Sequence, residues 1–180
     1  VAFLHTGDRM TLATLSIEVG AKAGIVPPVF ELPTDTELAP IDRAALANSV
    51  PEWLRVEEGA HYSRTVAIDL STLTPQISVP HYVDNVVDLP DVGRVAVDVV
   101  YLGTCTNGHY TDMAAAARIL QGKRVAKGVR LIVVPATSEA LRQATEDGTL
   151  ATLLAAGAAL GTPGCGACIG RHMGVLAPGE

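Results

Sequence analysis

Short apolar runs alternate with helical patterns in the second half of the chain, and this alternation constrains the fold more than any other feature. The runs AVDVVYL (96–102) and LIVVPA (131–136) are typical of buried strands. Helices are predicted over 110–121, from Ser138 onward, and over about 150–156. Because strands and helices follow one another in turn, the sequence predicts an α/β fold: a parallel sheet with helices on both faces.

The first half of the chain is less regular. Apolar positions at helical spacing predict a helix over 9–23. Residues 28–62 contain several prolines, so we expect a long irregular connection or a domain junction here, with a short helical stretch at 43–47. Two further expectations are a strand at 61–70 and an extended, proline-broken segment at 75–90. We therefore expect a partial α/β domain and junction over 1–90 and a separate α/β unit over 91–180.

Composition excludes several classes of partner. Lys and Arg number 13 against 19 Asp and Glu, a net charge of −6, whereas a nucleic-acid partner requires a basic surface. No apolar run approaches the roughly 20 residues that span a bilayer, and the start has no signal-peptide pattern. We expect a cytoplasmic protein without nucleic-acid or membrane partners. The chain lacks an initiator Met and its motifs begin at once, so we expect an internal fragment of a larger protein.

The chemistry of the chain centres on its three cysteines. Cys105 directly follows a predicted strand, and ligands bind at the carboxyl ends of parallel strands. Cys165 and Cys168 form a C-x-x-C pair in GTPGCGACIG, where glycines let the backbone approach a bulky inorganic group. Because both loops leave one α/β unit, we expect the three thiols to converge. Three cysteine ligands on a [4Fe-4S] cluster would leave one iron open as a Lewis acid.

Other readings of these cysteines remain open at this point. Structural zinc needs four ligands, and His172 could supply the fourth. A redox dithiol at Cys165 and Cys168 would leave Cys105 unexplained. Simple buried thiols are common in proteins, but these cysteines lie in glycine-rich loops and not in apolar runs.

Four segments resemble the aconitase superfamily, in the family's order, over most of 9–180. YLGTCTNGHYTDMAAAARIL and GTPGCGACIGRHMGVLAPGE resemble its two cluster-binding motifs, closest in wording to large subunits of the 3-isopropylmalate dehydratase and homoaconitase type. RMTLATLSIEVGAKAGIVPP and IDLSTLTPQISVPHYVDNVV resemble two further segments. The resemblance implies the aconitase-type three-layer α/β/α fold.

The resemblance also implies roles for individual residues. Cys105, Cys165 and Cys168 would be the cluster ligands, Glu18 would lie in the active site, and Asn107 would stand beside the cluster. A cluster with one solvent-reachable iron is prone to oxidative loss, so a sample can lack it.

Some positions depart from the family pattern. Thr14 replaces a common Asn near the substrate, and His109 replaces a usual Arg or Ser; both put the substrate in doubt. Val83 and Ala167 each replace a usual Pro, and both changes concern conformation.

The reaction implied is removal and re-addition of water on a hydroxy-di- or tricarboxylic acid, in leucine- or lysine-type biosynthesis. Citrate–isocitrate aconitase is the nearest alternative. The base would come from a small swivelling subunit or domain, and further catalytic groups from other large-subunit segments, so the chain alone is expected to be inactive. Two readings from other classes are a non-catalytic zinc module and RNA binding by a cluster-free form, which the acidic charge balance disfavours.

Overall fold

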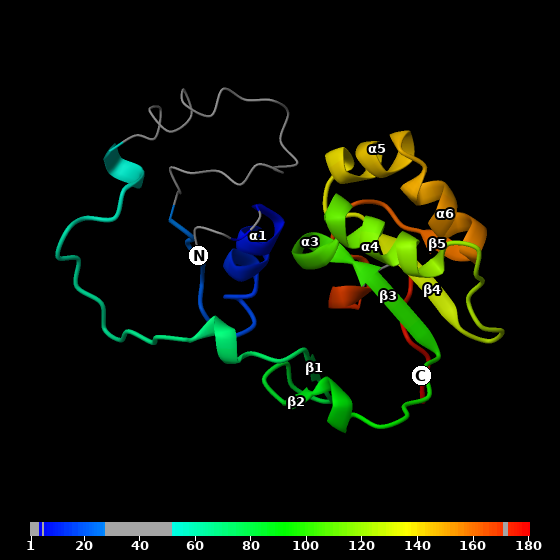
Figure 1. Ribbon diagram of the computed structural model, residues 1–180, viewed down its shortest axis with the longest axis horizontal. Coiled ribbons are helices and arrows are strands. Elements are labelled where there is room, and N and C mark those ends of the chain that lie inside the picture. The colour runs from blue at the N-terminus through cyan, green and yellow to red at the C-terminus, as the bar shows by residue number, and fades with distance from the viewer. Residues whose placement is uncertain (1–3, 5, 28–51, 171–172) are drawn as a thin grey trace.

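A three-stranded parallel sheet in the order β3-β4-β5 forms the middle of the unit made by the C-terminal half of the chain (Figure 1). Val99 of β3 pairs with Arg130 of β4, and Leu131 of β4 pairs with Ala158 of β5. This parallel sheet confirms the predicted α/β fold. The strands are β3 (Val99–Gly103), β4 (Arg130–Val134) and β5 (Ala158–Leu160). The computed structural model describes residue 4 and residues 6–27, 52–170 and 173–180.

Three helices connect the strands and form one layer. Helix α4 (Tyr110–Leu120) leads from β3 to β4, and helices α5 (Ser138–Glu146) and α6 (Thr149–Ala156) lead from β4 to β5. The three helices contact one another, which places them together against one face of the sheet (Figure 1). The helices predicted over 110–121, from Ser138 and over 150–156 are therefore confirmed.

The main core lies between this helical layer and one face of β4. Leu131 and Val133, which are two positions apart on β4, point toward the helices and pack with Met113 and Leu153. Met113 and Leu153 are completely buried. The remaining buried members of this core are Ala117, Ala140, Ala144 and Leu150.

The opposite face of β4 is covered by the C-terminal part of the chain. A Cβ at Gly174 would lie 2.7 Å from Ile132 Cδ1, and a Cβ at Gly161 would lie 2.8 Å from Val134 Cγ2. Backbone therefore runs directly over the side chains that alternate with Leu131 and Val133. Within the described part of the chain, this cover is a glycine-rich loop with a single 3-10 turn.

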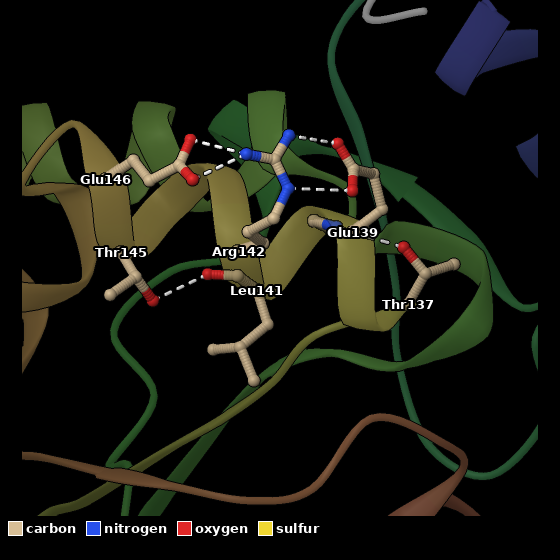
Figure 2. Close-up of polar contacts among 7 residues, drawn as sticks. Thr137, Glu139, Leu141, Arg142, Thr145 and Glu146 are labelled. Atoms are coloured by element: carbon tan, nitrogen blue, oxygen red, sulfur yellow. Dashed lines mark hydrogen bonds and ion pairs between the residues drawn. The ribbon is translucent and has the colours of Figure 1, made fainter.

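Local capping explains why the helix boundaries were predictable. The Thr137 side chain accepts a hydrogen bond from the Ala140 amide at 3.0 Å and begins α5 (Figure 2). Gly157 has φ of 105° and ends α6, as a left-handed glycine commonly does.

The N-terminal helix differs from the prediction. Helix α1 spans Thr6–Thr14, whereas the sequence pattern predicted a helix over 9–23. The Thr14 hydroxyl donates to the Met10 carbonyl, and the backbone then continues in turns to Gly20, whose φ is 84°. The apolar side chains expected on one face of this helix, Leu12, Leu15 and Val19, are exposed.

The segment 52–98 also differs in part. The strand predicted at 61–70 is absent: these residues are exposed and pair with no described strand. The extended segment predicted at 75–90 contains a small antiparallel hairpin of β1 (Gln76–Ser78) and β2 (Val86–Asp88). The helical stretch predicted at 43–47 lies outside the described residues.

Two short elements were not predicted. The predicted loop GTCTNG contains the one-turn helix α3 (Thr104–Asn107), and β5 completes the sheet after α6. The apolar run predicted as a buried strand at 96–102 forms β3 only from Val99, and Val100 within it is exposed while its other residues are half-buried. No described helix is long and apolar enough to cross a membrane.

Candidate metal centre

Cys105 lies at the carboxyl end of β3, on helix α3. The turn into α3 is sharp: Gly103 has φ of 128° and Thr104 has φ of 75°. A Cβ at Gly103 would lie 1.9 Å from the carbonyl oxygen of Val134, so only glycine lets the end of β3 approach β4 this closely. The Cys105 thiol is exposed at this edge of the sheet.

Cys165 directly precedes a short 3-10 turn, Gly166–Ile169, and Cys168 lies within it. The Cys168 amide donates a hydrogen bond to the Cys165 carbonyl at 3.1 Å. Gly164 and Gly166 have φ of 146° and 54°, conformations that other residues rarely adopt. The glycines that suggested a close backbone approach in the sequence therefore shape this turn.

Tyr101 connects the two cysteine-bearing segments. Its side chain extends from β3, and its hydroxyl donates a hydrogen bond to the Cys165 carbonyl at 2.9 Å. The same hydroxyl oxygen accepts a hydrogen bond from the Ala167 amide at 3.1 Å. The turn of Cys165 and Cys168 is thereby attached to the strand that ends at Cys105.

Electrostatic coupling between the cysteines supports this proximity. The pKa of the Cys165 thiol is raised, first by the negative charge of the Cys105 thiolate, then by burial, by a hydrogen bond with Cys105 and by the charge of Cys168. The pKa of Tyr101 is raised mainly by burial, with smaller contributions from the charges of Cys168 and Cys165. Three thiolates so placed repel one another, and a cationic metal group would relieve the repulsion.

The donor set fits a thiolate-bound metal group. All three cysteines are free and exposed, and thiolates are the ligands of iron–sulfur clusters and of zinc. Among the residues that the structure describes, no three His, Cys, Asp or Glu side chains are arranged around a single ion. In a cluster each cysteine binds a different iron, so the sulfurs need not converge on one point. His172, the fourth ligand of the zinc reading, lies outside the described residues.

Helix α1 packs beside α3, the one-turn helix that carries Cys105 (Figure 1). The Thr11 hydroxyl donates to the Thr106 carbonyl of α3 at 2.8 Å. The Thr14 hydroxyl is instead turned toward carbonyl groups of its own helix. Glu18 is exposed in the turns after α1, and no hydrogen bond or ion pair joins its carboxylate to another described residue. The structure thus brings the N-terminal helix to the cysteines without bringing the Glu18 side chain into contact with them.

Asn107 and His109 follow Cys105 but occupy different environments. Asn107 is exposed and lines an open cavity of about 940 Å³ between α1 and residues 66–71. His109 is 5% exposed and its ring lies near Gly7, where a Cβ would be 3.6 Å from the ring. Its Nε2 has no hydrogen-bond partner in the described part of the chain. His109 therefore packs between α1 and α4, whereas Asn107 faces solvent.

Sequence reasoning missed Tyr101. The available signal was its position: it lies four residues before Cys105, on the strand that leads to it, and the chain has only four tyrosines. A polar hydroxyl on an otherwise apolar strand usually needs a hydrogen-bond partner when it is partly buried. No sequence pattern indicates that this partner is the distant Cys165 turn.

Comparison with known proteins identifies the family of this chain. The family model described as "Aconitase family (aconitate hydratase)" matches residues 1–180. The 3-isopropylmalate dehydratase large subunit of Herpetosiphon aurantiacus is 71% identical over 180 residues, which are 100% of this chain and 40% of that protein. The homoaconitase large subunit of Thermus thermophilus is 54% identical over 177 residues, which are 98% of this chain and 40% of that protein.

A further relative is the 3-isopropylmalate dehydratase large subunit 1 of Deinococcus radiodurans, which is 52% identical over 174 residues. That match covers 97% of this chain and 38% of the relative. The chain thus spans about 40% of the length of the curated relatives it matches. With a family match over residues 1–180 and a parallel α/β unit that carries the cysteines, the chain belongs to the aconitase family.

Proposed function

We propose that this chain is part of the large subunit of a hydro-lyase and binds a [4Fe-4S] cluster through Cys105, Cys165 and Cys168. The observation that carries the proposal is the double hydrogen bond of Tyr101, which attaches the Cys165 turn to the strand ending at Cys105. When bound, such a cluster would supply one iron without a protein ligand, a Lewis acid for a substrate hydroxyl and carboxylate. Within this proposal, residues 91–180 form the cluster-binding unit and residues 1–90 a partial domain and junction.

The names of the relatives support a proposal for the substrate class. We assign a hydroxy-di- or tricarboxylic acid of the 3-isopropylmalate type, because a relative at 71% identity is named for that reaction. The homoaconitase relative at 54% makes the homocitrate–homoisocitrate type the second candidate, and the family description keeps aconitate hydratase as a third. The words "large subunit" in these names imply a small-subunit partner that would complete the enzyme. We propose the cytoplasm as its compartment.

The residues around the cysteines suggest how the chain would serve this substrate. Asn107 can donate its amide hydrogens to a substrate carboxylate, since it is exposed at the cavity beside the Cys105 turn. Glu18 is an exposed carboxylate that can accept a hydrogen bond from a hydroxyl group. Thr14 and His109 make internal contacts, so we assign them to holding α1 and α4 in place.

The test is anaerobic reconstitution with iron and sulfide, followed by quantification of both and by visible absorption spectroscopy. We expect about four irons and four sulfides per chain, with this binding lost in Cys105→Ser, Cys165→Ser and Cys168→Ser. Thr162→Ser, a conservative change in the same glycine-rich loop, is the control and should bind normally.

Two other outcomes would contradict the proposal. Uptake of one tightly bound zinc with no iron would indicate the structural zinc module instead. Iron binding that survives all three single serine substitutions would place the cluster elsewhere. If the cluster binds as expected, adding the remaining large-subunit segments together with the small subunit and assaying 3-isopropylmalate, homocitrate and citrate would rank the three substrates.

A further inference from the structure

We propose that Tyr101 is a positioning residue whose hydroxyl holds the turn of Cys165 and Cys168 beside Cys105. The inference deepens the proposed function, because the aligned thiols are the proposed cluster ligands. It concerns the protein alone, however, and applies with or without a bound metal group.

The first argument is the rigidity of the anchor. Tyr101 lies in the middle of β3, and its backbone pairs with Ile132 of the central strand β4. A tyrosine side chain has only two rotatable bonds, so ordering it costs little conformational entropy. The position of the hydroxyl is therefore set by the sheet and not by the loop that it contacts.

The second argument is the backbone flexibility of the glycine-rich loop that contains Cys165 and Cys168. Gly164, Gly166 and Gly170 all adopt positive φ, and glycine restricts the backbone less than any other residue. The hydrogen bonds made by the amides of Cys168 and Gly170 stay within the turn. Such bonds shape the turn but do not fix its place against the sheet.

The third argument is the pair of groups that Tyr101 joins. Its hydroxyl donates to the Cys165 carbonyl at 2.9 Å and accepts from the Ala167 amide at 3.1 Å, so one oxygen satisfies two backbone groups of the turn. Among the described side chains, no other forms a hydrogen bond with the backbone of Cys165 or Ala167. The second bond requires a residue other than proline at position 167, because the proline usual in the resembled motif has no N–H.

The geometry predicts what Tyr101→Phe should do. Phenylalanine keeps the ring and its packing on the strand but removes the single oxygen that makes both bonds. The turn should then move more freely relative to Cys105, while the sheet stays intact. A purely structural packing role would instead leave Tyr101→Phe indistinguishable from the parent protein.

The experiment compares Tyr101→Phe with Tyr110→Phe in the full chain. Tyr110 is the matched control, because its hydroxyl donates to the Asp147 carboxylate at 2.5 Å in the helical layer, where no cysteine lies. The first readout uses metal-free protein and a short bifunctional thiol reagent, with the Cys105–Cys165 cross-link quantified by mass spectrometry. The second uses iron-loaded protein and the rate of iron release to a ferrous chelator. Thermal unfolding verifies that both variants are folded.

We expect Tyr101→Phe to lower the cross-linking rate several-fold and to release iron about tenfold faster, the scale of one ordinary hydrogen bond. Tyr110→Phe should match the parent protein in both readouts. A folded Tyr101→Phe that matches the parent in cross-linking and in iron release would overturn the proposal.

The two readouts also separate the two proposals. If the parent protein takes up no iron but Tyr101→Phe still lowers cross-linking, the positioning role stands and the cluster assignment fails. If the parent binds four irons and Tyr101→Phe changes neither readout, the cluster assignment stands and the positioning role fails.

Discussion

The unit from β3 to β5 and the segment 52–98 contain similar apolar residues but bury them very differently. Met113 and Leu153 in the first are completely buried, whereas Val66 and Ile68 in the second are 63% and 67% exposed. The first region provides two surfaces that face each other, a helical layer and a sheet, whereas the second is a single extended layer. Apolar residues form a core only where the chain supplies both surfaces.

The largest expected effect tests how closely strands β3 and β4 approach each other. In Gly103→Ala the new Cβ would lie 1.9 Å from the Val134 carbonyl, in a backbone conformation with φ of 128°. Overpacking and backbone strain together should lower the free energy of unfolding by about 4 kcal/mol. The control is Gly59→Ala in the segment 52–98, where φ is 79° and no atom lies within 4 Å. It should cost about 1 kcal/mol or less in urea unfolding. Equal costs at the two glycines would remove the distinction between the regions.

The second prediction compares the same substitution in both regions. Leu153→Ala removes a completely buried side chain from the core and should cost about 3 kcal/mol in urea unfolding. Leu73→Ala removes a side chain that is 55% exposed in the segment 52–98, and the cost should stay below about 1 kcal/mol. A cost at Leu73 close to that at Leu153 would show that the extended segment is packed in solution.

This contrast explains which parts of the fold could be predicted from the sequence. The helix after Ser138 and the end of α6 at Gly157 have capping signals within a few residues, and both were predicted correctly. The strand predicted at 61–70 has suitable residues, but a strand requires a partner, and partner choice is not a local property. Helix α1 ends at Thr14 because side-chain hydroxyls compete for its carbonyl groups, which apolar spacing alone does not reveal.

The candidate site divides in the same way. Cys105 could be placed at the end of a strand because the apolar residues that predict this strand stand directly before it in the sequence. The Cys165 turn is joined to that strand by the Tyr101 hydroxyl, a contact across 64 positions that has no local signature in the sequence. The burial of His109 against Gly7 is likewise a tertiary property.

The third prediction concerns helix caps in the two regions. Thr137→Ala removes the hydrogen bond to the Ala140 amide at the start of α5 and should cost about 1 kcal/mol in thermal or urea unfolding (Figure 2). Asp69 makes a comparable cap in the segment 52–98, where its carboxylate accepts from the Ser71 amide at 3.0 Å. Asp69→Ala should leave the unfolding midpoint unchanged, because residues 70–72 are exposed and belong to no core. A midpoint shift in Asp69→Ala as large as that in Thr137→Ala would contradict this view.

The smallest expected effect lies on the exposed side of α5. Arg142 bonds Glu139 at 2.5 Å and Glu146 at 2.5 Å, and it stands between the two carboxylates (Figure 2). The hydrogen bond from Arg142 lowers the pKa of Glu139 below its ordinary value. A carboxyl group with a lowered pKa in the folded state contributes stability above its unfolded pKa and loses it as the pH falls through the folded pKa.

Arg142→Gln should therefore raise the pKa of Glu139 toward its ordinary value, as measured by an NMR titration of the side chain. The accompanying change in stability should be small and further reduced by salt, because both partners are exposed. Asp147 is the internal control: its pKa is lowered mainly by the Tyr110 hydroxyl, so it should respond to Tyr110→Phe and not to Arg142→Gln. If Glu139 titrates identically with and without Arg142, the ion pair is not formed in solution. The stability of α5 would then come from its Thr137 cap and its buried alanine face alone.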